Sequence, residues 1–578
     1  MVAADAETVP SLPYHEPAIR TILVQSSFLL LLNLVNAALD RLVYCGLLGQ
    51  VFLGIAWGTP GAKWLSSEVE EVIVQLGYLG LILLVYEGGL STSFKSLKAN
   101  IVLSSAVALT GIGLPIGLSY TLQPLLGATP LQAFAAGAAL CSTSLGTTFT
   151  VLASSGLSSS RLGVVLTSAA MMDDVVGLVM VQVISNLGGG DIGALVIARP
   201  VLVSVAFACI VPLLCRMVVK PSTIVLNRFR KSQPDAWLAK LLCLRHTAFV
   251  LHTALLLGLV AGASYAGTSN LFAAYIAGAV ISWWDSEVPH PVHRLESKTS
   301  SKGKIEPAQT SSRETTREFG VISAAADIQA GLEQDHEEER DPGATSQKEP
   351  QVDEDTSGTA VYERYYQQAV SRILQPLFFA SIGFSIPITR MFRGSIVWRG
   401  IVYTILMAAG KLTCGFWLVR FSLAPLKETL SKVLARLRLP SIPHFWGKKD
   451  SSVSRPRPES TQGQQDTNTQ TNRHTSPEPK PFSLHPPLIL ACAMTARGEI
   501  GFLISSVAES KGVFSSGQQE PGSSSDMFLV VTWAIVLCTI LGPLGVGLSV
   551  RRVKRLEEKK NREQEGAGRD VLGVWGVG

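Results

Sequence analysis

The chain has 578 residues, of which 47% are hydrophobic and 16% are charged, and its formal net charge is +5. Ordinary soluble proteins carry about 25% charged residues, so this composition excludes that class and predicts a protein that crosses a membrane several times. No basic, aromatic-interleaved patch of a nucleic-acid binder is present, and no Cys/His cluster suggests a metal cofactor. We therefore expect no nucleic-acid partner and no cofactor.

Thirteen apolar stretches follow one another along the chain, and they predict transmembrane helices separated by polar connections. The fold class is thus expected to be an all-α polytopic membrane protein of about 13 transmembrane helices. The predicted spans are 21–39, 43–58, 72–91, 101–122, 131–154, 162–186, 195–217, 246–265, 269–285, 369–387, 395–419, 486–508 and 527–549.

Lysine and arginine residues between the spans predict the orientation, because cytoplasmic connections carry an excess of both. The basic run 551–555 follows the last span and should be cytoplasmic, and an odd number of spans then puts the N-terminus outside or in a lumen. The two long polar connections are expected to be disordered cytoplasmic loops. The predicted division is an N-terminal segment 1–20, a first membrane half 21–285 (spans 1–9), a loop 286–365, spans 10–11 in 366–419, a second loop 420–483, spans 12–13 in 484–549 and a cytoplasmic tail 550–578.

Five of the charged residues inside predicted spans stand out. Asp173 and Asp174 are in the middle of the sixth span, Lys411 is in the eleventh, and Arg497 and Glu499 are in the twelfth. A charged side chain at the bilayer centre costs roughly 2.5–3.5 kcal/mol, so such residues face protein or water and indicate an ion or proton site. The aspartates are candidate counter-ions of Lys411. The alternatives are that Lys411 reaches the membrane interface, and that Arg497 and Glu499 form purely structural ion pairs.

Two spans contain residues that interrupt a helix. The fifth has the hydroxyl-rich segment Cys141–Thr148 around Gly146, and the twelfth has Gly498 and Gly501 around its charges. Clustered hydroxyls compete for backbone hydrogen bonds, although small residues can instead serve close helix packing. The fifth and the twelfth spans differ by seven, an odd number, in the order of spans, so they cross the membrane in opposite directions. This predicts an inverted repeat with two crossing discontinuous helices, an architecture of secondary transporters.

Several motifs give a resemblance to a known family. The segment 137–180, which includes both aspartates, resembles the core of the monovalent cation:proton antiporter-2 family, especially its bacterial sodium/proton antiporters. Further matches follow in order along the chain and cover nearly all of its membrane region. They are Leu48–Gly54, Tyr86–Leu90, Asn270–Gly278, Pro376–Gly383 and Arg497–Gly501.

The resemblance implies roles for single residues. Asp174 matches the carboxylate that alternately binds cation and proton, and Asp173 matches the neighbour that forms a salt bridge with the lysine matched by Lys411. Thr143, with Ser144 beside it, matches the hydroxyl of the broken fifth span. Arg497 and Glu499 match the charged pair of the second broken helix and compensate charge, while Gly146, Gly498 and Gly501 are expected at the helix breaks.

The implied function is exchange of Na⁺ or K⁺ for protons by alternating access, with a role in pH homeostasis. The two adjacent carboxylates suggest two protons per cation and hence electrogenic exchange. Family resemblance also implies a homodimer in the lipid bilayer, and the plasma membrane or a vacuolar or endosomal membrane is expected. A cation channel is an alternative, but it would show a repeated filter or a ring of charges. A transport-inactive sensor is another. An enzyme is not expected, because no nucleophile–base pair is apparent.

Overall fold

The computed structural model describes fourteen stretches of the chain, and the following account concerns these residues. They are 14, 16–43, 45–92, 94–144, 157, 160–188, 194–233, 236–237, 245–287, 356–419, 483–515, 525–563, 572 and 575. Every regular element among them is a helix.

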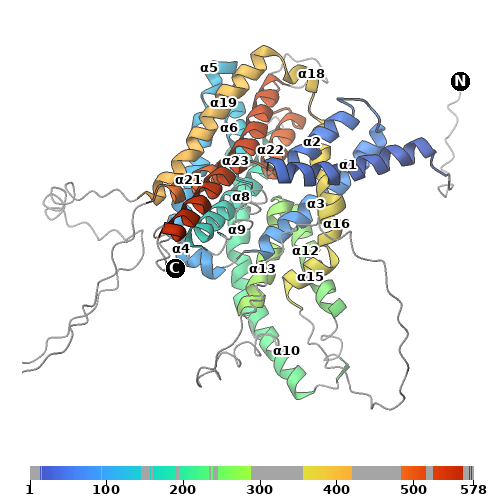
Figure 1. Ribbon diagram of the computed structural model, residues 1–578. Coiled ribbons are helices and arrows are strands. Elements are labelled where there is room, and N and C mark those ends of the chain that lie inside the picture. Colours follow the sequence, from blue (N-terminus) through green and yellow to red (C-terminus); the bar gives the residue numbers. More distant parts are fainter. Residues whose placement is uncertain are drawn as a thin grey trace, which may run out of the picture.

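The helices before residue 290 follow the predicted order (Figure 1). Pro200 and Pro212 lie within α9, and a π-helical turn continues this helix into a basic helix, α10, which extends into the connection predicted to be cytoplasmic. The elements are α1 (Ile19–Val43), α2 (Gly46–Trp57), α3 (Ser67–Leu90), α4 (Phe94–Ser119), α5 (Leu122–Leu126), α6 (Pro130–Ala139), α8 (Arg161–Leu187), α9 (Ala194–Leu214), the π-helical turn Cys215–Val219, α10 (Lys220–Ser232), α12 (Arg245–Ala266) and α13 (Asn270–Glu287).

The later helices begin at residue 358, inside the stretch predicted as a loop up to 365. The predicted twelfth span is divided into α21 and α22, and α23 continues beyond the predicted end of the thirteenth span into the tail. The elements are α15 (Gly358–Tyr365), α16 (Gln367–Ala369), the π-helical turn Val370–Leu374, α17 (Gln375–Phe384), α18 (Ile388–Met391), α19 (Gly394–Leu412), the 3₁₀ segment Thr413–Leu418, α21 (His485–Thr495), α22 (Glu499–Ser510) and α23 (Asp526–Glu563).

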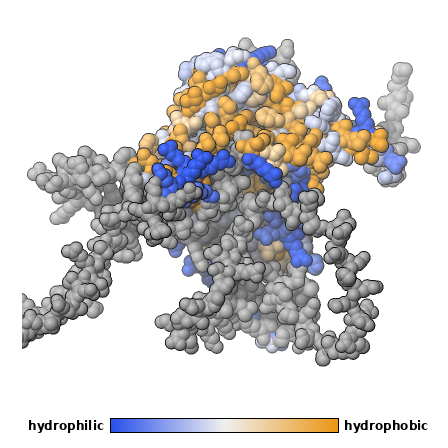
Figure 2. Space-filling view, in the orientation of Figure 1, coloured by the Kyte–Doolittle hydropathy of each residue, from blue (hydrophilic) through white to orange (hydrophobic). Residues whose placement is uncertain are grey.

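The protein is an all-α polytopic membrane protein. In the described part of the chain, nine helical segments are long and apolar enough to cross a membrane. Figure 2 shows the matching surface, where hydrophobic residues cover most of the described face that is in view. Each of the thirteen predicted ranges contains helix. The count of thirteen spans stays a prediction, because the helices in the other four predicted ranges are not among these nine.

Two groups of helices can be distinguished by their packing (Figure 1). In the first, α8 packs against α4, α6, α21 and α22, while α23 packs against α19 and α21. In the second, α3 packs against α13 and α17, and α17 packs against α2. We call them the α8 group and the α3 group.

Glycines explain why the helices of the α3 group lie so close together. A Cβ atom on Gly278 of α13 would overlap the carbonyl oxygen of Tyr86 in α3, and one on Gly54 of α2 would overlap that of Ala380 in α17. Small residues allow such backbone contact between membrane helices, where packing rather than the hydrophobic effect drives association. The motifs around these glycines therefore have a packing function in this group.

Candidate functional site

The segment that follows α6 lies against the break between α21 and α22. Helix α6 ends at Ala139, and residues 140–144 continue without helical structure. Helix α21 ends at Thr495, and Gly498 is extended, with φ −160° and ψ −140°, before α22 begins. The backbone N–H of Ser144 donates a 3.0 Å hydrogen bond to the Ala496 carbonyl. The segment after α6 therefore lies against the break between α21 and α22, and we call this contact the crossing.

The glycines at the breaks differ from the prediction in part. Gly498 does lie at a break, and a Cβ there would be only 2.5 Å from Ser144 Oγ. Placing Gly501 at a break was wrong, because it lies inside α22, one turn after the break. Its Cα faces the Ala139 carbonyl, where an added Cβ would be 2.8 Å from the oxygen, so Gly501 allows close packing. Gly146 lies outside the described residues.

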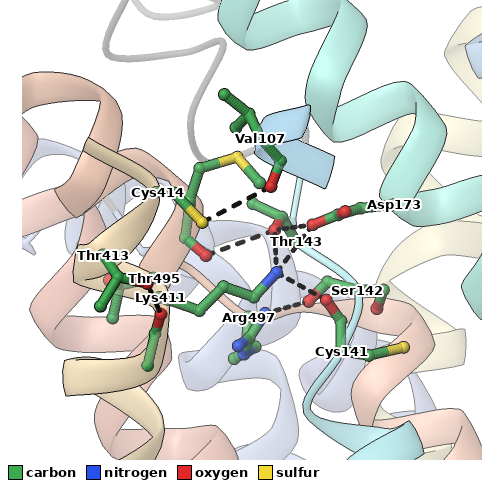
Figure 3. Close-up of polar contacts among 12 residues, drawn as sticks. Val107, Cys141, Ser142, Thr143, Asp173, Lys411, Thr413, Cys414, Thr495 and Arg497 are labelled. Atoms are coloured by element: carbon green, nitrogen blue, oxygen red, sulfur yellow. Dashed lines mark hydrogen bonds and ion pairs between the residues drawn. The ribbon is translucent and has the colours of Figure 1, made fainter. Parts of the chain in front are cut away.

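Lys411 is fully buried at the crossing (Figure 3). It comes from the last turn of α19, and its ammonium group donates to Asp173 Oδ2 at 2.7 Å, to the Cys141 carbonyl at 2.6 Å and to Thr143 Oγ1 at 3.1 Å. Three acceptors match the three N–H groups of a lysine. The salt bridge between Asp173 and Lys411 is thus formed, and the interface position weighed for Lys411 is not adopted.

Asp173 is as deeply buried as its partner. Its Oδ2 atom accepts hydrogen bonds from Lys411 and from the Thr143 hydroxyl, the latter at 2.9 Å. Its Oδ1 atom has no hydrogen-bond partner among the described residues. Gly111 of α4 provides room for the pair, since a Cβ there would be 3.1 Å from Lys411 Nζ and 3.3 Å from Asp173 Oδ2.

Asp174 has a different environment, although it is the next residue of α8. Its exposed fraction is 8%, compared with 0% for Asp173. No hydrogen bond to its carboxylate occurs within the described part of the chain, and it interacts electrostatically with Glu499, Asp173 and Lys411. One aspartate is therefore held directly by a cation and a hydroxyl, whereas the other has two carboxylates nearby and no direct contact with the cation.

Arg497 and Glu499 contact two residues of the segment that follows α6. The fully buried Arg497 donates from Nη1 to the Ser142 carbonyl. Glu499 accepts a long hydrogen bond, 3.4 Å, from the Ser144 hydroxyl. The two side chains form no ion pair with each other in the described residues. Gly177 of α8 adjoins this contact, because a Cβ there would lie 2.9 Å from Ser142 Cβ and 3.0 Å from Ile500 Cγ2.

Sequence reasoning missed the backbone contribution to the site. The carbonyl groups of Cys141, Ser142 and Met494 point at Lys411, Arg497 and Thr143, respectively. A helix that ends leaves carbonyl groups without intrahelical partners, so the predicted breaks are the sequence signal for free backbone acceptors at this site. Inside a membrane such groups need partners from the protein, and here three side chains provide them.

Comparisons with known proteins support the resemblance. Residues 27–303 match the family model described as sodium/hydrogen exchanger, transmembrane. A high-affinity Na⁺/H⁺ antiporter, NhaS3, from Synechocystis sp. is 34% identical over 140 residues, 24% of this chain and 30% of that protein. A Na⁺/H⁺-K⁺ antiporter, GerN, from Bacillus cereus is 32% identical over 153 residues, 26% of this chain and 39% of that protein.

A third relative, the probable Na⁺/H⁺ antiporter GerT of Bacillus cereus, is 32% identical over 185 residues, 31% of this chain. The matched region spans from 30% to 49% of the length of these three relatives. A solved sodium proton antiporter, MjNhaP1 from Methanocaldococcus jannaschii, aligns over 92% of this chain and 99% of its own, with 12% identity and a TM-score of 0.47. Over residues 27–303, the chain is thus similar to the transmembrane sodium/hydrogen exchangers, which are transporters.

Proposed function

We propose that the chain exchanges a monovalent cation, Na⁺ or K⁺, for protons by alternating access, and that Asp174 carries both in turn. The observation that supports this most strongly is the contrast between the two aspartates. Asp173 is neutralised by Lys411, while Asp174 has no hydrogen-bond partner among the described residues and is 8% exposed. A buried carboxylate without a partner is expected to take up a proton or a cation.

The charge of the crossing supports a monovalent ligand. Three carboxylates, Asp173, Asp174 and Glu499, face two cations, Lys411 and Arg497, so one negative charge remains when all are ionised. While Lys411 keeps its proton, one Na⁺, one K⁺ or one proton neutralises this charge, whereas a divalent cation leaves an excess. Ser144 and Thr143 supply hydroxyl oxygens beside the carboxylates, and hard cations bind such oxygen ligands.

The exchange is proposed to run as a competition. With a proton on Asp174, Lys411 stays on Asp173. When a cation binds Asp174, it attracts the Asp173 carboxylate, Lys411 leaves that carboxylate, and one proton is released from Asp174 and one from Lys411. Two protons for one cation make the exchange electrogenic. A net charge moved through the membrane is worth about 2.3 kcal/mol per 100 mV.

For alternating access we propose that the α8 group moves against the α3 group, so that the crossing faces one side of the membrane at a time. We further propose a homodimer with the N-terminus outside or luminal and the C-terminus cytoplasmic, in the plasma membrane or a vacuolar or endosomal membrane. The basic run from Arg551 to Arg555 at the end of α23 supports this orientation.

Reconstituted proton transport tests the proposal. Proteoliposomes holding a pH-sensitive dye are diluted into Na⁺, K⁺, Li⁺ or choline at equal ionic strength. We expect proton movement that requires an alkali cation and is absent with choline. Proton movement that is indifferent to all four cations, or cation uptake without proton movement, as a channel would show, contradicts the proposal.

The stoichiometry has its own test. The same vesicles are held at 0 and −100 mV with valinomycin and a fixed K⁺ gradient, and Na⁺-driven proton flux is compared. Unequal exchange predicts that voltage changes the rate and the end point. Flux that is identical at both voltages would leave exchange in place but rule out the two-to-one ratio.

A further inference from the structure

A cavity of about 430 Å³ lies beside the segment of α8 that carries the aspartates. Its volume is within the range of pockets that hold small ligands, roughly 300–1,000 Å³. Its walls come from α8, α9, α13 and the start of α4, and nearly all of the lining side chains are aliphatic, aromatic or sulfur-containing. Examples are Met172, Val176, Ile276, Val280 and Trp283.

The composition of the cavity argues against a water-filled route to the site. Its polar members include Thr92 and Tyr275, whose hydroxyls hydrogen-bond to each other at 2.9 Å, and Tyr275 is itself only 8% exposed. The helix that forms one wall, α9, is strongly outward-facing, because only 11% of its span is buried. An apolar cavity behind such a helix is expected to be filled from the bilayer, where acyl chains are the abundant apolar molecules.

Two cationic residues adjoin lining residues of the cavity in the sequence, one in α4 and one in the π-helical turn after α9. Lys98 directly follows the lining residue Leu97, and Arg216 directly follows the lining residue Cys215; both are exposed. Neither forms an ion pair within the described part of the chain. Lys220, nearby on α10, does have a partner, since it lies 3.4 Å from Glu287 at the end of α13. Basic residues at this end of membrane helices attract anionic lipid headgroups.

We propose that the cavity binds an anionic phospholipid, with one acyl chain between α8 and the wall formed by α9 and α13 and with the headgroup at Lys98 and Arg216. The charge at the rim selects the anionic headgroup, and the apolar walls accept the chain. The binding site is independent of the transport proposal. Its consequence for transport rests on the proposed function: a chain between α8 and α13 fills the surface along which the two groups of helices would slide.

Photolabelling of the full chain in liposomes tests this proposal. The probes are phosphatidylglycerol and phosphatidylcholine that carry the same diazirine-labelled acyl chain, and mass spectrometry locates the label. We expect phosphatidylglycerol to label the lining residues of α8, α9 and α13 several-fold more than phosphatidylcholine does. Because one cation near the surface contributes about 1 kcal/mol, or roughly fivefold, Lys98→Gln with Arg216→Gln should remove that preference.

The matched control is Arg228→Gln with Arg393→Gln, which removes two exposed arginines that do not adjoin the cavity. It should leave the labelling unchanged. A second variant, Ala279→Phe, fills the cavity and should remove the label from both lipids, provided that the protein elutes as the wild type does. Any of three results would overturn the proposal. They are equal labelling by the two lipids, equal loss of the preference in the control and in Lys98→Gln with Arg216→Gln, and no labelling of the lining residues by either lipid.

Discussion

Helices α8 and α9 follow each other in the chain and are both long enough to span a membrane, yet their surroundings are opposite. The span that contains α8 is 56% buried, whereas that of α9 and its extension is 11% buried, although α9 is the more hydrophobic. In a bilayer, hydrophobicity does not drive a helix into the protein, since lipid is equally apolar. The two aspartates of α8 require protein around them, whereas the charged residue of α9, Arg199, lies near the start of the helix and is exposed.

The first prediction removes the charge of Asp174, one of the two charges that require protein around α8. Asp174→Asn should reduce cation-dependent proton flux in proteoliposomes to that of empty vesicles, because the amide binds neither proton nor cation at neutral pH. The matched control is Asp526→Asn at the start of α23, where the side chain is 50% exposed and pairs with Arg390. Normal flux in Asp174→Asn would refute the assignment of the site.

The second prediction concerns stability. Lys411→Ala leaves Asp173 buried and unpaired, and breaking a buried pair in this way costs about 3–5 kcal/mol of unfolding free energy. Asp173→Asn combined with Lys411→Ala should recover part of that loss. Thermal unfolding in detergent measures both. Lys220→Ala, which breaks the exposed pair with Glu287, is the control and should cost less than about 1 kcal/mol.

A third prediction applies one substitution to both helices. Leu178 of α8 is 1% exposed and Leu202 of α9 is 66% exposed. Leu178→Ala should cost about 2–5 kcal/mol through the cavity that it leaves, and Leu202→Ala less than about 0.5 kcal/mol. Thermal unfolding again provides the measurement. Similar losses for both variants would mean that α9 is covered by a partner in the membrane.

The smallest expected effect is at the crossing of the broken helices. Gly498→Ala should cost about 1–3 kcal/mol through overpacking, because the new Cβ meets Ser144. Combining it with Ser144→Gly should restore part of the stability, which separates contact from backbone strain. Gly113→Ala in α4 is the control, since nothing lies within 4 Å of a Cβ there. If Ser144→Gly restores no stability, the contact between the added Cβ and Ser144 is not the cause of the loss.

Much of the fold could be predicted from the sequence, because apolar runs of about 20 residues are typical of transmembrane helices. The site could be predicted in part. Charges inside a span are costly, so Asp173, Asp174 and Lys411 stand out as a group in the amino-acid sequence itself. The break in the twelfth span could likewise be located near Gly498, from the charges and glycines that interrupt an apolar run.

Other features depend on contacts that a single sequence does not reveal. Gly498 and Gly501 are equally plausible helix breaks in the sequence. In the structure Gly501 instead lies inside α22, where it allows close packing against the Ala139 carbonyl. The partners of Arg497 and Glu499 are a carbonyl and a hydroxyl of the segment after α6. The predicted break indicates that free carbonyl groups are present there, but not which side chain each of them contacts. The cavity beside α8 arises from the relative positions of four elements.

The most direct test of the central claim measures competition between the proton and the cation for Asp174. In wild-type proteoliposomes, the KM for the transported cation is determined at a series of pH values on the side of cation uptake. One shared site predicts that KM rises as the pH falls, while the maximal rate at saturating cation changes little across the acidic part of the series. A KM that stays constant with pH would contradict the account, because the proton and the cation would then bind at different sites.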